Sequence, residues 1–203
     1  MVEFEKFFIP HIGKTGGTAI QAICRSLNLP VVKISKNNDP SKHNKPSSHL
    51  YESKDLVLSI RRLISREISQ INHWFIRGNK KSFQIENAAD FMLSQNSSEI
   101  SLNQMTCNGT KEPRFFIRSE FLIDDLNEVF NFYFGIDDTR IDQMIEVAFD
   151  IRKRDELNYN RDIFNWFNPQ QIAKMYKQSP LWTKYEKLAY GPFGQSNSSS
   201  FFI

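Results

Sequence analysis

The chain has 203 residues, of which 40% are hydrophobic, and this is enough for the core of one α/β domain or of one domain with a small helical extension. Its 18 phenylalanines, with only 8 glycines and 8 prolines, exclude a disordered or fibrous class. A formal net charge of +3 is too small to indicate a nucleic-acid partner, but it allows a local basic pocket for an anionic ligand.

Short apolar segments alternate along the chain with segments of helical periodicity, which is typical of an α/β fold with a parallel sheet. The first apolar segment is followed by a glycine-rich loop and a helical segment, and this order is the opening of a βαβ unit. Polar stretches at 35–48 and 77–112 interrupt the pattern. We predict strands at 7–9, 31–34, 56–60 and 115–117, and helices at 19–27, from 61 onward, and at 85–94, 119–130, 140–149, 169–178 and 181–190.

The sequence contains no internal repeat and no convincing domain boundary, so we predict a single domain at 1–203 with a flexible tail at 190–203. The N-terminus lacks the basic and apolar regions of a signal peptide, and no window approaches the length of a membrane span. We therefore expect a soluble, cytoplasmic protein. Cys24 and Cys107 match no zinc or redox spacing, and we expect two reduced thiols.

Residues 11–18, His-Ile-Gly-Lys-Thr-Gly-Gly-Thr, connect the first predicted strand to the first predicted helix. The free N–H groups of such a turn carry partial positive charge, and the glycines let the backbone approach an anion closely. Lys14 adds a full positive charge, and Thr15 and Thr18 add hydroxyl donors. A Walker A loop has its Lys after the second glycine, whereas Lys14 precedes the glycine pair. The segment therefore predicts a phosphate-binding loop of another kind.

A second basic segment follows the predicted strand at 56–60. Arg61 lies at the carboxyl end of this strand, and ligands of open α/β sheets bind at that edge. Ser65 and Ser69 are four residues apart, so they share one face of the predicted helix. Arg61, through a forked contact, and Ser69, through its hydroxyl, can converge on one phosphate.

The two segments resemble the donor-binding segments of sulfotransferases that use 3′-phosphoadenosine 5′-phosphosulfate (PAPS), most closely the branch of Golgi carbohydrate sulfotransferases and their bacterial relatives. In that family the loop binds the 5′-phosphosulfate and the second segment binds the 3′-phosphate. The branch commonly has Pro in place of Gly13 and Asp-Pro in place of Arg62-Leu63, and Arg66 falls on its second Arg. The residues that the resemblance assigns to PAPS are Lys14, Thr15, Gly16, Gly17, Thr18, Arg61 and Ser69.

The segment at 116–126 resembles a later strand-to-helix segment of the same family, although an ordinary capped amphipathic helix is an equal alternative. The resemblance implies a P-loop-like three-layer fold, in which helices flank a central parallel sheet and the C-terminal part is helical. It also implies an enzyme that transfers a sulfuryl group from PAPS to a hydroxyl or an amine. A carbohydrate or another hydroxyl compound is the expected acceptor.

The catalytic residues that we expect are Lys14 and one histidine. Lys14 is the candidate to neutralise the charge that builds on the leaving nucleotide, because sulfuryl transfer depends on positioning and charge stabilisation. Bacterial members of the family often have a His about 18 residues before the equivalent of Arg61, which implies that His43 is the general base. His49 is the second candidate, and the sequence offers no metal-ligand cluster.

Two other functions remain open at this point. A P-loop phosphotransferase needs acidic Mg²⁺ ligands, for which Asp124 and Asp125 are candidates, but the loop lacks the Walker A order. A non-catalytic member of the family would bind the nucleotide or a partner without a base. The acceptor is not identified by the sequence, and we expect its pocket to be formed by the loops at 35–50 and 77–112 and by the C-terminal helices.

Overall fold

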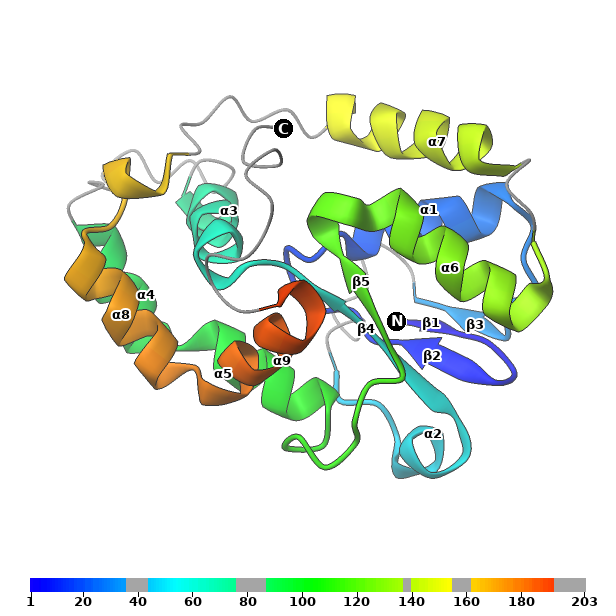
Figure 1. The fold of residues 1–203 in the computed structure, drawn as a ribbon, viewed down its shortest axis with the longest axis horizontal. Coiled ribbons are helices and arrows are strands. Elements are labelled where there is room, and N and C mark those ends of the chain that lie inside the picture. Colours follow the sequence, from blue (N-terminus) through cyan, green and yellow to red (C-terminus); the bar gives the residue numbers. More distant parts are fainter. Residues whose placement is uncertain (36–43, 76–86, 137–139, 155–161, 192–203) are drawn as a thin grey trace.

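The computed structural model describes residues 1–35, 44–75, 87–136, 140–154 and 162–191 (Figure 1). Within these residues a mixed sheet has the strand order β3-β1-β2-β4-β5. β2 is parallel to β4 and β4 to β5, whereas β1 is antiparallel to both of its neighbours. The strands are β1 (Val2–Glu3), β2 (Phe7–Ile9), β3 (Lys33–Ile34), β4 (Asp55–Ile60) and β5 (Phe115–Arg118).

Helices cover both faces of the sheet, which gives three layers (Figure 1). Alternation along β4 sends Leu58 and Ile60 to one face and Val57 to the other. The Val57 face packs against α1 (Gly17–Ser26), α6 (Leu122–Phe134) and α7 (Ile141–Arg154). The opposite face packs against α3 (Leu63–Phe75), α4 (Ala88–Gln95), α5 (Ser97–Met105), α8 (Pro169–Gln178) and α9 (Pro180–Tyr190). The predicted α/β class is confirmed.

The sheet is not wholly parallel, which corrects the predicted topology. The unpredicted strand β1 lies between β3 and β2 and runs antiparallel to both. The N–H of Phe4 donates to the carbonyl oxygen of Phe7 at 2.9 Å, so β1 and β2 form a tight hairpin. Of the strand predicted at 31–34, only Lys33–Ile34 forms a strand, at the outer edge of β1, and the N–H of Val32 donates to the carbonyl of Glu3. A two-residue strand has no periodicity to detect, and β1 was missed for this reason.

Helix α5 lies where we predicted part of a polar excursion. Its buried side chains include Ser98 and Glu99, which bind partners inside the protein. Hydrophobic periodicity does not detect a helix whose inward face is partly polar. The helix predicted at 85–94 corresponds to α4, although residues 85 and 86 lie outside the described part of the chain. The predicted tail also lies outside it, apart from Tyr190 and Gly191.

Both cysteines are free thiols, as predicted. Cys24 is buried in α1, and its burial raises the pKa of the thiol to about 12. Among the described helices, none has the length and apolar character needed to cross a bilayer.

Buried carboxylates cap the first turns of helices that are distant in sequence. Glu99 in α5 accepts hydrogen bonds from the backbone N–H groups of Leu181 and Trp182 at 2.9 and 3.0 Å, at the start of α9. Glu186 in α9 accepts a hydrogen bond of 2.8 Å from the N–H of Leu63, the first residue of α3. The N–H groups of a first turn have no partner within their own helix, and they attract negative charge. The two carboxylates therefore tie α5, α9 and α3 together.

We expect Glu99→Ala to lower the free energy of unfolding by about 2–3 kcal/mol, because two backbone donors in a buried helix start lose their acceptor. Urea denaturation measures this change. The matched control is Glu112→Ala, which removes an exposed carboxylate paired with Lys184 and should cost less than about 1 kcal/mol. If both variants lost the same free energy of unfolding, the buried cap would contribute no more to stability than the exposed ion pair does.

Candidate functional site

Three predicted segments meet at one edge of the sheet. Because β2, β4 and β5 are parallel, their carboxyl ends lie at the same edge. The predicted phosphate-binding loop at 11–16 follows β2, Arg61 follows β4, and Ser119 follows β5. The loop is tied to β4 by a 2.8 Å hydrogen bond between the hydroxyls of Thr15 and Ser59. The hydroxyl of Ser119 donates to the carbonyl of Ile60 at 3.3 Å, so β5 is tied to the end of β4 in the same way.

The loop has the backbone geometry of an anion-binding turn. Lys14 has φ 68° and Gly16 has φ 86°, while Thr15 between them has negative φ. This alternation is typical of backbone nests, in which successive N–H groups point to one side. Gly16 is the N-cap of α1, and within the described residues no side chain caps this helix and no acidic side chain lies in its first turn. The first N–H groups of α1 are therefore suited to bind an anion.

Gly17 has no room for a side chain, because the ring of His11 lies against it. A Cβ on Gly17 would lie 2.8 Å from Nδ1 and from Cε1 of His11. His11 is buried, and its Nδ1 lies 3.4 Å from the side-chain nitrogen of Gln21 in α1. The imidazole thus packs under the first turns of α1, a structural position that agrees with our preference for the other histidines as the base.

The two threonines of the loop differ in what they can offer a ligand. The Thr15 side chain is fully buried, and its hydroxyl donates to the carbonyl of Ile12 at 3.0 Å besides its contact with Ser59. Its hydroxyl is thus used to hold the loop, which leaves its backbone N–H as the group that can face a phosphate. Thr18, in the first turn of α1, is exposed.

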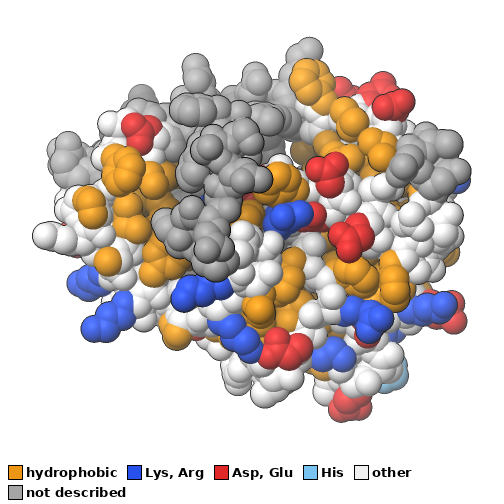
Figure 2. All heavy atoms as spheres, viewed as in Figure 1, with side chains coloured by type: hydrophobic (Ala, Val, Ile, Leu, Met, Phe, Trp, Pro, Cys, Tyr) orange, Lys and Arg blue, Asp and Glu red, His pale blue; other side chains and the backbone are white. Residues whose placement is uncertain are grey.

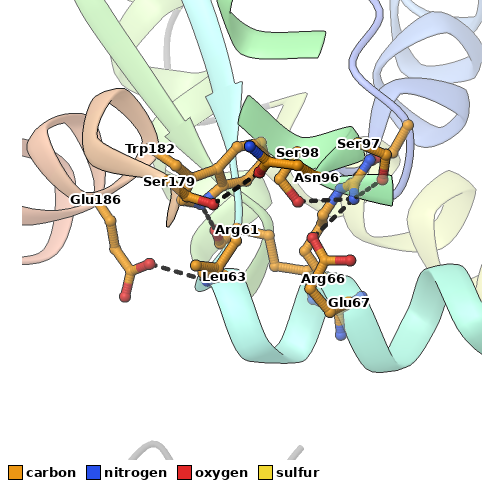
Figure 3. Close-up of polar contacts among 11 residues, drawn as sticks. Arg61, Leu63, Arg66, Glu67, Asn96, Ser97, Ser98, Ser179, Trp182 and Glu186 are labelled. Atoms are coloured by element: carbon orange, nitrogen blue, oxygen red, sulfur yellow. Dashed lines mark hydrogen bonds and ion pairs between the residues drawn. The ribbon is translucent and has the colours of Figure 1, made fainter. Parts of the chain in front are cut away.

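The guanidinium of Arg66 binds the loop, and Figure 3 shows its contacts with Glu67 and with the serines at the start of α5. Arg66 is 2% exposed, and its Nε donates to the carbonyl of Gly13 at 3.3 Å. Its Nη1 donates to Ser97, Ser98 and Glu67 at 3.0, 2.8 and 2.9 Å. Burial raises the pKa of Glu67, and the charge of Arg66 opposes this increase. Arg66 therefore binds protein groups, and it acts on the site by fixing the residue before Lys14.

Arg61 reaches the predicted edge, but it already has a negative partner there. Its Nε lies 3.7 Å from a carboxylate oxygen of Glu120, and its carbonyl accepts a hydrogen bond of 3.1 Å from the indole of Trp182. Ser69 is half-buried in α3, three residues after Arg66, whose side chain reaches Gly13. The structure thus brings the loop and Arg61 to one edge of the sheet, with α3 beside them.

Of the two candidate bases, His49 is not brought to this edge, and His43 lies outside the described residues. His49 lies in α2 (Ser48–Ser53), which ends just before β4 begins, whereas Arg61 follows the end of β4. The six residues of β4 span roughly 17 Å, so the exposed His49 is near the opposite edge of the sheet. Its ring nitrogen lies 3.5 Å from the hydroxyl of Ser53, within its own helix.

The acidic residues considered for Mg²⁺ are placed differently. Asp125 is buried and is clasped by Arg118, whose Nε and Nη2 donate to it at 2.9 and 2.6 Å and whose backbone N–H donates at 2.6 Å. These hydrogen bonds raise the pKa of Arg118, which is one sign of a tight pair. Asp124 is exposed, and no group of three or more potential metal-ligating side chains occurs in the described part of the chain.

Figure 2 shows one face of the molecule, and on its described part Lys and Arg side chains are interspersed with Asp and Glu, without a broad patch of one charge. A cavity between α3, α4, α5 and α8 is lined by Glu67, Ser98 and Met175 among others, but its volume of about 10 Å³ suits one water molecule and not a nucleotide. Any anion site here is therefore local and depends on the loop and Arg61.

Comparison with known proteins assigns no family: no protein-family model matches the chain, and no curated protein or solved structure is significantly similar to it.

We expect Gly17→Ala to destabilise the protein by about 1–3 kcal/mol, because the added methyl group would overlap the buried ring of His11. Gly13→Ala is the matched control in the same loop. Its Cβ would meet only the flexible end of Gln70 at 3.4 Å, so its stability should change by less than about 1 kcal/mol. Thermal or urea denaturation of both variants gives the comparison. A Gly17→Ala protein as stable as Gly13→Ala would mean that His11 moves aside freely.

Proposed function

We propose that the chain is a sulfotransferase that transfers a sulfuryl group from PAPS to a hydroxyl or an amine of an acceptor. The observation that carries the proposal is that two separate elements suited to bind an anion lie at one sheet edge. One is the loop that ends in the uncapped first turn of α1, and the other is Arg61 at the end of β4. Two separated elements suit a nucleotide with phosphates at its 3′ and 5′ positions better than the contiguous phosphates of ATP.

The residues present fit such a donor. The N–H groups of residues 15–18 are at the start of a ten-residue helix and suit the 5′-phosphate. The Nε of Arg61 is buried and has no hydrogen-bond acceptor in the described part of the chain, so an incoming phosphate oxygen would satisfy it. Ser69, half-buried on the neighbouring helix α3, is the further hydroxyl that we assign to the 3′-phosphate.

Bound PAPS would supply the sulfuryl group. The residues of the chain would position this group and stabilise the charge that develops on the leaving nucleotide. Lys14 is held with positive φ between Gly13, which is anchored by Arg66, and Thr15, which is anchored by Ser59. A lysine in this place can neutralise the oxygen that the nucleotide retains. His43 remains our candidate for the base that removes the acceptor proton. A carbohydrate or a small hydroxyl compound remains the proposed acceptor.

The alternative of a P-loop phosphotransferase has less support. Asp125, which would have to bind Mg²⁺, already accepts three hydrogen bonds from Arg118. A carboxylate in such a clasp would lose them on binding a metal ion. A non-catalytic nucleotide-binding protein would have the same donor site, so turnover is the measurement that distinguishes it from the enzyme.

We expect 3′-phosphoadenosine 5′-phosphate to bind more tightly than ATP or ADP, and Arg61→Ala to weaken this binding by about 30–1,000-fold. The loss follows from leaving a buried phosphate without its paired cation. Isothermal titration calorimetry measures both. Arg25→Ala, which removes an exposed arginine from the far end of α1, is the control and should bind as the wild type does. Unchanged affinity in Arg61→Ala would refute the donor assignment.

We expect Lys14→Ala to lower kcat by at least about 100-fold and to lower the affinity for 3′-phosphoadenosine 5′-phosphate much less. The reason is that the charge on the leaving oxygen is greatest in the transition state. Release of the nucleotide product, followed with PAPS and an acceptor or with slow PAPS hydrolysis, gives kcat, and calorimetry gives the affinity. Equal losses of both quantities would reduce Lys14 to a binding residue.

A further inference from the structure

The carboxylate of Glu120 occupies the place beside Arg61 that the proposed function gives to the 3′-phosphate. Its Oε1 lies 3.7 Å from the Nε of Arg61, and its Oε2 accepts a hydrogen bond from the hydroxyl of Tyr190. At 3.7 Å the contact is an ion pair without a hydrogen bond, so the buried Nε–H of Arg61 stays unsatisfied within the described residues. Glu120 thus neutralises Arg61 without binding it tightly.

Tyr190 holds Glu120 in this position. It is the last residue of α9, and the guanidinium of Arg62 lies 4.6 Å from the centre of its ring. Its hydroxyl also lies 3.4 Å from the carbonyl oxygen of Ile60, at the end of β4. Burial, followed by the charge of Glu120, raises the pKa of Tyr190, so at neutral pH its hydroxyl keeps the proton that it donates. The carboxylate is therefore held by a residue that is itself fixed against the sheet edge.

We infer that Glu120 is a built-in competitor of the donor's 3′-phosphate for Arg61. The inference rests on the proposed function. A phosphate monoester carries more negative charge than a carboxylate and has three strong acceptor oxygens, so it can satisfy the Nε–H of Arg61 and displace Glu120. When the product leaves, Glu120 pairs with Arg61 again. The exchange lowers the affinity for a nucleotide with a 3′-phosphate and favours its release.

The competition affects only ligands that must break the Arg61–Glu120 pair. A nucleotide without a 3′-phosphate, such as ADP, leaves the pair intact, so its affinity does not depend on the charge of Glu120. The substitution Glu120→Gln separates the two cases. It removes the charge and keeps a side-chain oxygen that can accept the hydrogen bond of Tyr190.

By calorimetry, Glu120→Gln should bind 3′-phosphoadenosine 5′-phosphate about tenfold more tightly than the wild type and should bind ADP with unchanged affinity. Glu112→Gln is the matched control, because it changes the net charge equally. Glu112 lies just before β5 begins, so it is at the opposite edge of the sheet, where it pairs with Lys184. The Glu112→Gln variant should bind both nucleotides with the affinity of the wild type.

The double variant with Arg61→Ala completes the test. If Glu120 acts through Arg61, Glu120→Gln gives no gain in the Arg61→Ala background. A gain that persists there, or an equal gain in Glu112→Gln, would mean a general charge effect and would overturn the inference. Equal affinities of the wild type and Glu120→Gln would also overturn it, while a wild-type preference for the 3′-phosphate over ADP would leave the proposed function standing. Absence of that preference would refute both proposals.

Discussion

The arrangement of the candidate site depends on the hydrogen bonds that the buried guanidinium of Arg66 makes. A charge that is 2% exposed is costly to bury, and the cost is offset only when paired charges and hydrogen bonds satisfy it. Glu67 supplies the charge, two serines at the start of α5 supply acceptors, and the carbonyl of Gly13 accepts from Nε. The centre of the Trp182 ring lies 5.6 Å from the Cζ of Arg66. The loop, α3, α5 and α9 are thereby fixed around one group.

Each arginine described above at this edge of the sheet has an acidic partner, so these arginines add little net charge to it. The N–H groups of the loop backbone carry partial positive charge that does not depend on the small net charge of the protein. The four pairs are Arg61–Glu120, Arg62–Glu186, Arg66–Glu67 and Arg118–Asp125. Their separations differ: Arg66 and Arg118 make close contacts of 2.9 and 2.6 Å, whereas Arg61 and Arg62 each lie 3.7 Å from their partners. The position predicted to bind a ligand thus holds one of the two loose pairs.

The sequence predicted the parts of the fold that depend on local pattern. The order of strand, glycine-rich loop and helix correctly placed the glycine-rich loop between β2 and α1, and the apolar run before Arg61 placed that residue at the end of β4. Contacts between distant residues could not be predicted in this way. The ion pair of Glu120 with Arg61 and the cap that Glu99 provides for α9 require knowledge of which helices meet in space. The inward turn of the Thr15 hydroxyl likewise depends on Ser59, which is far away in the sequence.

The contacts of α9 with the turn after β4 have a consequence for the order in which the molecule forms. The hydrogen bonds from Trp182 to Arg61, from Leu63 to Glu186 and from Tyr190 to Ile60 join residues that are 121, 123 and 130 positions apart in the chain. Contacts between residues so far apart in the sequence require the closure of long loops. During synthesis the N-terminal part of a chain is available for folding first. The first turn of α3 must therefore wait on the ribosome for its cap until α9 has emerged. All five strands precede α9 in the chain, so the contacts of α9 with this edge can form only after the strands have been synthesised.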